Sequence, residues 1–154
     1  MFLHYWNNPQ ASADKYVGDW LLTGDTGRMD EDGYIRFVGR DDDVITSAGY
    51  RIGPAEIEDN ILQHAAVNMV AVIGAPDPLR TEIVVAVIVL NEGYQGTDAL
   101  KREIQEHVKV RLAAHEYPRE LFFVEQLPMT TTGKVIRRVL REQVSQWRQQ
   151  AATS

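Results

Sequence analysis

The spacing of hydrophobic residues predicts two amphipathic helices in the second half of the chain. Between residues 98 and 115 an apolar residue recurs at every fourth position: Leu100, Ile104, Val108 and Leu112. Thr97 or Asp98 is expected to cap this helix. Near the C-terminus one apolar stripe follows the helical period: Val135, Ile136, Val139, Leu140 and Val144. The final residues, "QQAATS", are polar and are expected to fray.

A third, shorter helix is expected to begin at Pro54. Proline suits the first position of a helix because its missing N–H is not needed there. The apolar face of this helix consists of Ile57, Ile61 and Leu62. A helix with a single apolar face is expected to pack against a sheet.

Runs of β-branched residues predict the strands of that sheet. Two such runs, at 67–73 and 83–90, are separated by "GAPDPLRT", whose glycine and two prolines indicate a connection. The run "IVVAVIVL" is apolar at nearly every position, which is typical of a central strand or of one covered on both faces. A further strand is expected in "ELFFVEQLP" at 120–128.

Turn signals predict two hairpins in the first third of the chain. Asp32-Gly33 lies between strand-like runs in "MDEDGYIRFVGR", and Ala48-Gly49 separates the short runs 44–46 and 50–52. All of these elements together predict an α+β fold, in which helices flank a small mixed sheet and a short β-hairpin precedes it. The one shift in composition lies in "GRDDD" at 39–43, where a new unit is expected to begin.

Composition narrows the class of protein. The 154 residues are 44% hydrophobic, which is enough for a buried core in one domain, or in one domain with a piece of another. Cysteine is absent, so disulfides and thiolate metal sites are excluded, and the four histidines show no metal-ligand spacing. No apolar run approaches the roughly 20 residues of a membrane span, and the N-terminus lacks the basic start of a signal peptide. We therefore expect a soluble, cytoplasmic protein without a metal site.

The net charge of −6 argues against general affinity for nucleic acids. The charge is uneven, however, because basic residues gather near the C-terminus: Lys134, Arg137, Arg138, Arg141 and Arg148. Among neighbouring residues only Glu142 balances them. A solvated helix face is the simplest interpretation, and a helix that binds phosphate or nucleic acid is the alternative.

Spacing excludes two familiar ligand loops. "PMTTTGKVIRR" at 128–138 ends like a Walker A loop, but Pro128 stands where that motif has its first glycine, and Val135 stands where it has Ser or Thr. The acidic stretch around Asp32-Gly33 lacks the glutamate of an EF-hand, because Gly39 occupies its place. Neither loop is expected here.

Four short motifs, each weak alone, occur in one order: "TGD" at 23–25, "GRDDD" at 39–43, "SAGYRIGPAEIE" at 47–58 and "PMTTTGK" at 128–134. In this order and spacing they resemble the C-terminal motifs of the AMP-forming adenylating superfamily, which includes acyl-CoA synthetases, peptide-synthetase adenylation domains and luciferases. The resemblance runs from about Tyr5 to Arg141. "GYRIGPAEIE" is most similar to the branch that activates medium-chain acyl, aryl and acetate groups, and "YWNNPQASA" resembles the end of the large N-terminal domain of acyl-CoA synthetases.

The resemblance implies two domains. Residues 1–41 would be the C-terminal end of the large N-terminal adenylating domain, and residues 42–154 would be the mobile C-terminal lid. The family's phosphate-gripping loop, adenine pocket and acyl pocket would lie before Met1, so Met1 would be internal to a longer enzyme. The missing domain would be the partner of the lid.

Three residues resemble the family's nucleotide-binding residues. Asp25 resembles the ribose-binding aspartate, whose two oxygens can accept hydrogen bonds from both ribose hydroxyls. Arg40 resembles the arginine that reaches the ribose or phosphate, a task for which a rigid fork of donors is suited. Arg51 resembles an arginine that contacts the ATP phosphates. An ordinary ion pair at a hairpin end is the alternative for Asp25 and Arg40.

Other positions resemble the family's hinge and coenzyme A site. Asp42 matches the hinge, a single position that absorbs a large change in φ and ψ. Gly49 and Tyr50 fall where the family admits the pantetheine arm, and a glycine leaves room there that a Cβ would fill. Lys109, with Arg111, lies where relatives hold the coenzyme A phosphates. A simple hairpin turn is the alternative for Gly49, and a solvated helix face is the favoured interpretation of Lys109.

Lys134 resembles the family's catalytic lysine, which a flexible Thr/Gly loop carries into the active site for one half-reaction and out for the other. A carboxylate that attacks the α-phosphate of ATP brings two anions together, and an ammonium group between them would position both and stabilise the transition state. Stability does not explain the position, because a cation at a helix N-terminus is disfavoured by the helix dipole. Acetylation, which inactivates related enzymes, would remove this charge.

The resemblance implies an ATP-dependent acyl-CoA synthetase, which converts a carboxylic acid, ATP and coenzyme A into acyl-CoA, AMP and pyrophosphate. Mg²⁺ would accompany ATP, with ligands outside this chain, and the chain alone is expected to be inactive. One alternative is a stand-alone α+β module that binds nucleic acid or protein through its basic helix. The other is the adenylation domain of a peptide synthetase, which would normally continue into a carrier domain where this chain ends.

Overall fold

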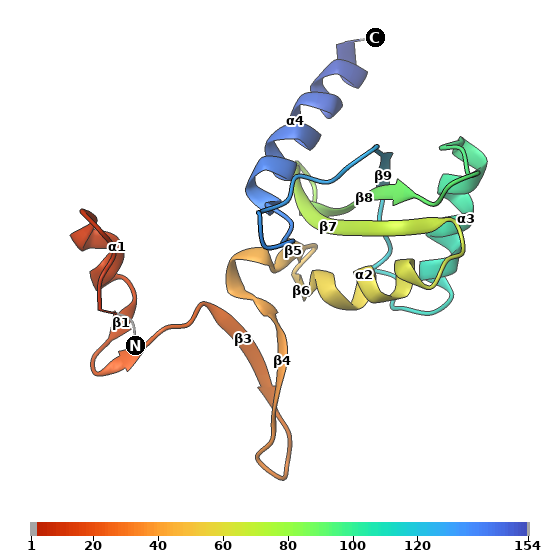
Figure 1. Ribbon diagram of the computed structural model, residues 1–154. Helices are drawn as coiled ribbons and strands as arrows, with labels where there is room; N and C mark the ends of the chain where they lie inside the picture. The colour runs from red at the N-terminus through yellow and green to blue at the C-terminus, as the bar shows by residue number, and fades with distance from the viewer. Residues whose placement is uncertain (1–2, 154) are drawn as a thin grey trace. The chain divides into compact units, whose positions relative to one another are not determined.

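The computed structural model describes residues 3–153 and divides the chain into two compact units, Met1–Asp42 and Asp43–Ser154 (Figure 1). The expectation that Met1 is internal to a longer enzyme concerns a position outside the described residues, and so does the polar end at Ser154. The α+β class is confirmed, because both units contain helices and small sheets.

The first unit contains short elements: α1 (Pro9–Ala13), β1 (Tyr16–Val17), β2 (Trp20–Leu21), β3 (Asp25–Met29) and β4 (Ile35–Arg40), followed by a 3-10 turn over Asp41–Asp43. The hairpin of β3 and β4 confirms the prediction around Asp32-Gly33. Its loop is closed by Asp30, whose Oδ1 accepts hydrogen bonds from the backbone N–H groups of Asp32 and Tyr34. Helix α1 and strand β1 were not predicted from the sequence.

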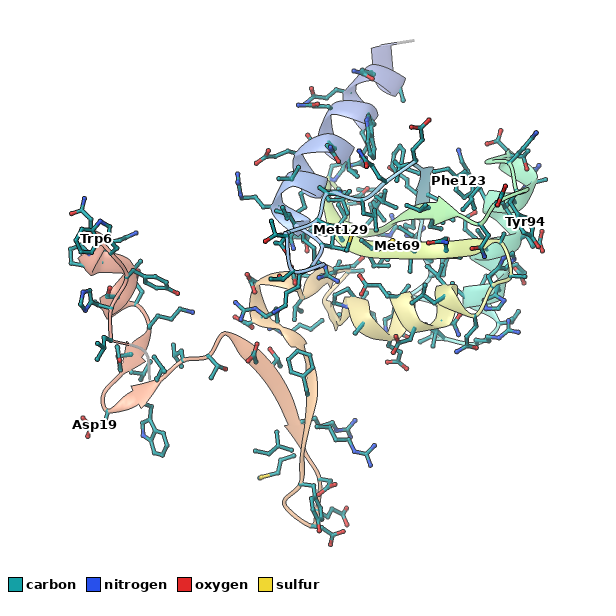
Figure 2. The ribbon with its side chains drawn as sticks, in the orientation of Figure 1. Trp6, Asp19, Met69, Tyr94, Phe123 and Met129 are labelled. Atoms are coloured by element: carbon teal, nitrogen blue, oxygen red, sulfur yellow. The ribbon has the colours of Figure 1, made fainter. Side chains whose placement is uncertain are left out.

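The first unit buries few of its large apolar side chains. Trp6 is 92% exposed and Trp20 is 79% exposed, while Phe37 on β4 is 68% exposed. Figure 2 shows Trp6 directed away from the ribbon. The described residues of this unit form no apolar core, so it has little hydrophobic stabilisation of its own.

The second unit contains the main sheet and three helices. Its elements are β5 (Ile45–Ser47), β6 (Tyr50–Ile52), α2 (Pro54–Leu62), β7 (Val67–Asp77), β8 (Thr81–Leu90), α3 (Asp98–Lys109), β9 (Glu120–Phe123) and α4 (Arg137–Thr153). The strand order is β6-β5-β8-β7, and β9 pairs with β8 in parallel while the other pairs are antiparallel. The sheet is therefore mixed, as predicted.

Strand β8 lies at the centre of the second unit with helices on both faces (Figure 1). Val84, Ala86 and Ile88 belong to a core with residues of α2 and α3. The alternate residues Val85 and Val87 belong to a second core with Leu140 and Val144 of α4. This arrangement explains the continuous apolar run "IVVAVIVL", since burial of each Val or Ile side chain contributes about 1.5–3 kcal/mol.

The elements differ from the sequence prediction mainly at their ends. Strand β7 continues through Gly74 to Asp77, past the expected connection, because it is an edge strand of the sheet and an edge strand tolerates Pro76. Helix α3 ends at Lys109, three residues before Leu112. Strand β9 covers only the first part of the predicted 120–128 segment.

The helices show the same pattern of agreement and difference. Ile57 and Ile61 of α2 are fully buried, but Leu62 at its last position is 46% exposed, so its predicted place on the buried face is wrong. The buried stripe of α4 is confirmed at Leu140 and Val144. This helix begins only at Arg137 and continues through Thr153, so fraying of residues 149–153 is also wrong. No helix among residues 3–153 has the length and apolar character needed to cross a membrane.

His107 joins α3 to α2, since its Nε2 lies 3.1 Å from the backbone oxygen of Asn60. Burial is the main cause that lowers the pKa of His107 below 6.5; the nearby charges of Arg111 and His64 act in the same direction, and the bond to Asn60 opposes them. The folded protein therefore binds this proton less readily than the unfolded chain. The resulting stability is complete above about pH 6.5 and is lost as the pH falls below that value.

We expect the melting temperature to fall when the pH is lowered from about 7.5 to about 5, and to fall less steeply in a His107→Gln variant. Glutamine cannot take up a proton, but its Nε2 can still donate to the Asn60 oxygen. Thermal unfolding followed by circular dichroism at several pH values measures both slopes. Equal slopes in the two proteins would contradict this role of His107.

Candidate functional site

In the first unit, Asp25 and Arg40 face each other across the β3–β4 hairpin. The ladder register pairs the two residues directly. Arg40 Nη1 lies 3.3 Å from Asp25 Oδ1 and donates to the backbone oxygen of Thr23 at 3.2 Å. Gly24 has φ +81°, and a Cβ there would lie 3.0 Å from Arg40 Nη2, so glycine leaves the space that the guanidinium occupies. The structure therefore brings two of the predicted nucleotide-binding residues together.

Asp42, the predicted hinge, contacts the same guanidinium. Arg40 Nε donates to Asp42 Oδ1 at 3.2 Å. Asp42 is the main cause that raises the pKa of Arg40, and Asp25 adds to it, because both carboxylates favour the charged form. All three side chains are substantially exposed, so this cluster is open to a ligand.

In the second unit, Gly49, Tyr50 and Arg51 lie together on the β5–β6 hairpin. Ala48 has φ +50° and Gly49 has φ +84°, which are the left-handed conformations of a tight hairpin turn. No heavy atom lies within 4 Å of a Cβ built on Gly49, so the turn is also open on that side. The hairpin-turn interpretation of Gly49 is thus confirmed, and it leaves room for a slender ligand.

The exposed ring of Tyr50 stacks on His115, which the sequence analysis did not single out. The ring centroids are 4.0 Å apart and the ring planes differ by 11°. His115 follows α3 by several residues, so only the tertiary fold brings the two rings together. A lone histidine in "AAHE" carries no sequence signal for this contact.

Lys109 lies at the last position of α3, on the exposed face of the helix. Its Nζ is 3.7 Å from Glu106 Oε2, while Arg111 Nη1 donates to the backbone oxygen of His107 at 3.0 Å. Both contacts are local to α3 and to the turn that follows it. They fit the solvated-face interpretation, which the sequence analysis favoured.

The Lys134 loop, residues 128–136, is closed by its own backbone. Thr130 N donates to Lys134 O at 2.8 Å, and Lys134 N donates to Thr130 Oγ1 at 3.0 Å. Met129 and Val135 form an antiparallel bridge, and Ile136 N donates to Pro128 O at 2.8 Å. Gly133, with φ +79°, allows the turn. Figure 2 labels Met129 at the start of this loop, beside the first turn of α4.

Lys134 presents its side chain to solvent from this closed loop. No ion pair or hydrogen bond of its Nζ is found within residues 3–153. Because α4 begins three residues later, Lys134 precedes the helix and does not lie in its first turn. The backbone is fixed while the ammonium group remains available, which is the arrangement that a positioned, reactive cation requires.

The basic residues of α4 are paired with acids from other parts of the second unit. Arg137 binds Glu58, Arg141 binds Asp43, and Arg148 binds Glu120, at 2.6, 3.1 and 3.1 Å. Arg138 binds Glu142 within the helix at 3.0 Å. Only the last pair was apparent from the sequence, because the acids of the other pairs are distant in the chain. Little net positive charge therefore remains for a nucleic acid.

No cluster of three or more His, Asp or Glu side chains with the geometry of a metal site occurs in the described part of the chain. In the acidic run 41–43, the carboxylates of Asp42 and Asp43 form ion pairs with arginines.

Comparison with known proteins identifies the family. The model of the AMP-binding enzyme C-terminal domain matches residues 56–134, a segment that ends on Lys134 itself. The chain belongs to this family. The resemblance drawn from the four motifs is thereby confirmed.

Curated relatives of this AMP-binding C-terminal domain protein are acyl-CoA synthetases. Mouse acyl-coenzyme A synthetase ACSM3, mitochondrial, is 50% identical over 144 residues, which are 92% of this chain and 25% of the relative. Human ACSM1, also named mitochondrial, is 48% identical over 144 residues with the same coverage. The chain thus spans about a quarter of the length of the curated relatives it matches.

Solved structures agree in sequence and in fold. The anthranilate CoA ligase AuaEII, in complex with anthranoyl-AMP, is 41% identical with a TM-score of 0.80, over 91% of this chain and 27% of that one. A Brucella canis acyl-CoA synthetase is 47% identical with a TM-score of 0.68, over 90% of this chain and 26% of that one.

Proposed function

We propose that this chain supplies the C-terminal lid of an AMP-forming acyl-CoA synthetase, which uses ATP to join a carboxylic acid to coenzyme A. The observation that carries the proposal is the exposed ammonium group of Lys134, which has no partner among the described residues and lies on a loop closed by its own hydrogen bonds. Family membership and the names of the relatives support it, since both refer to AMP-binding enzymes or acyl-CoA synthetases.

In the first half-reaction the acid attacks the α-phosphate of ATP, an acyl-adenylate forms, and pyrophosphate leaves. We propose two roles for the ammonium group of Lys134 in this step. It reduces the repulsion between the attacking carboxylate and the phosphate, and it stabilises the negative charge that develops on the phosphoryl oxygens. Asp25 would accept hydrogen bonds from the ribose hydroxyls. Arg40 would donate to the ribose or phosphate with the guanidinium nitrogens that Asp25 and Asp42 leave available, and Arg51 would contact the phosphates.

In the second half-reaction the thiol of coenzyme A attacks the acyl-adenylate, and AMP leaves. A turn at Asp42 would remove Lys134 and bring the β5–β6 hairpin to the reaction centre. The open side of Gly49 would admit the pantetheine arm beside Tyr50, whose ring is stacked on that of His115. Lys109 would contribute only weakly to binding the coenzyme A phosphates, because its contacts are local.

The proposal includes the two domains inferred from the motifs. Residues 1–41 would end a large adenylating domain, and residues 42–154 would form the lid. The division of the structure after Asp42 is compatible with this boundary. Mg²⁺ would accompany ATP, but the described residues offer it no cluster of ligands, so we assign no step to the metal. A cytoplasmic location remains a prediction.

The full-length protein that contains this chain tests the proposal. Incubated with ATP, Mg²⁺ and coenzyme A, it should form AMP and acyl-CoA in equal amounts when a suitable acid is present. A panel from acetate to medium-chain and aromatic acids, analysed by liquid chromatography, covers the expected substrates. Absence of acid-dependent AMP formation with every acid would refute the proposal.

The same assay separates the alternatives. A peptide-synthetase adenylation domain would load a carrier-protein thiol in preference to coenzyme A. A module for nucleic acids is disfavoured by the structure, because acidic side chains neutralise the arginines of α4.

A further inference from the structure

Two arginines of α4 hold both carboxylate oxygens of Asp43. Arg137 Nη1 lies 3.5 Å from Asp43 Oδ2, and Arg141 Nη2 lies 3.1 Å from Asp43 Oδ1. The arginines are four residues apart, so they project from the same face of the helix. The side chain of Asp43 is only 13% exposed, which limits screening by solvent.

Arg137 also binds Glu58 of α2. Its Nη2 lies 2.6 Å from Glu58 Oε1, and the same oxygen accepts a hydrogen bond from Val72 N of β7 at 2.8 Å. One guanidinium thus connects α4 to α2, to β7 and to the first residue of the second unit. The network of Arg137, Arg141, Asp43 and Glu58 contains two positive and two negative charges, so it is neutral as a whole.

The position of Arg137 also determines where Lys134 lies. Arg137 is the first residue of α4 and follows Lys134 by three residues. Val135 and Ile136, which lie between them, are partly buried, and Val135 packs against the second core. The backbone of Lys134 therefore cannot shift far without moving the start of α4.

Stability alone is a poor reason for this network. Arg137 Nε is buried and has no hydrogen-bond partner within the described residues, which is unfavourable. Apolar residues of similar volume in place of a buried ion pair are often equally or more stabilising. A planar guanidinium with two carboxylate partners does, however, fix orientation better than apolar packing does.

We propose that Asp43, Glu58 and Arg137 are positioning residues that couple the hinge at Asp42 to the Lys134 loop. This inference rests on the proposed function. Asp43 follows the hinge directly in the chain, whereas Lys134 comes about ninety residues later by numbering. The ion pair between Asp43 and Arg137 links the hinge to the start of α4 directly, without the intervening ninety or so residues of chain. When the hinge turns, Asp43 and Lys134 move as one body, so the ammonium group returns to the same place in every cycle.

The test uses the full-length protein with the variants Arg137→Gln and Asp43→Asn. The matched control is Arg138→Gln, which removes an exposed pair from the same turn of α4. ATP/pyrophosphate exchange measures adenylation, and thioester formation from supplied acyl-adenylate measures the second half-reaction. We expect both variants to lower kcat for exchange by about 10- to 100-fold, since small displacements of a reacting group have effects of this size.

The KM for ATP and the rate of thioester formation should change little in both variants, and Arg138→Gln should resemble the wild type. A double variant should lose little more than either single variant, because the two residues act as one unit. Equal loss in both half-reactions would show a purely structural role and overturn the inference, and so would unchanged exchange. If Arg137→Gln does not fold, the nearly isosteric Asp43→Asn decides. Failure of the proposed function is recognised separately, because the wild type would then show no exchange with any acid.

Discussion

Replacement of Lys134 by alanine is expected to slow ATP/pyrophosphate exchange in the full-length protein by about 100- to 1000-fold, the usual cost of removing one preorganised donor from a developing oxyanion. The fold should be unaffected. The loop is closed by backbone groups and by Thr130, and the Lys134 side chain takes no part in it. Thioester formation from supplied acyl-adenylate should remain close to that of the wild type, because in the proposed mechanism Lys134 leaves the site before that step.

Two further variants control for charge. Lys101→Ala removes another lysine of the second unit, which forms a local ion pair with Asp98 within α3, and should leave exchange unchanged. Lys134→Arg keeps the positive charge and should recover part of the rate, since the guanidinium is larger and differently shaped. The assignment of Lys134 would be wrong if the alanine variant slowed both half-reactions to the same extent.

Substitution of Gly49 by leucine is expected to have the opposite pattern. Thioester formation should fall by about 10- to 100-fold, because a side chain would fill the space through which we propose that the pantetheine arm enters, and would displace the thiol. Exchange should be nearly unaffected, since coenzyme A takes no part in it. Single-turnover measurements of the two half-reactions give both values.

Backbone strain at Gly49 needs its own control. The residue has φ +84°, so leucine there costs about 1–2 kcal/mol whatever its effect on the ligand. Gly93 has φ +87° and is equally free of neighbouring atoms, so Gly93→Leu carries the same strain away from the hairpin. If both variants slow thioester formation equally, strain and not obstruction is the cause.

The fold was largely predictable from local patterns, and the errors occurred where the tertiary structure decides. The buried positions Ile104, Leu140 and Val144 follow from helical spacing alone. The length of β7 could not be predicted from the sequence, because a proline such as Pro76 is tolerated in an edge strand and not in a central one. Leu62 belongs to an apolar pattern, yet its place at the end of α2 leaves it exposed.

The candidate site was predictable only in its motif residues. Asp25, Arg40, Gly49 and Lys134 were found through ordered motifs, and the structure confirms that Asp25 and Arg40 lie together. Their roles remain predictions. His115, Asp43 and Glu58 were missed as partners, because each meets its neighbour across a long stretch of chain and has no local signal. The charge of α4 was misjudged for the same reason.

The antiparallel pairing of β7 and β8 has a consequence for the order of folding. These strands are joined by a short turn, so the entropic cost of pairing them is small. Their ladder is therefore expected to form early in folding. Strand β5 pairs with β8 only at Ser47 and Thr81, and the 128–136 loop is attached later still along the chain. The β5–β6 hairpin that carries Gly49 is therefore expected to pair with the sheet after the central ladder, which should retain its amide hydrogens longest.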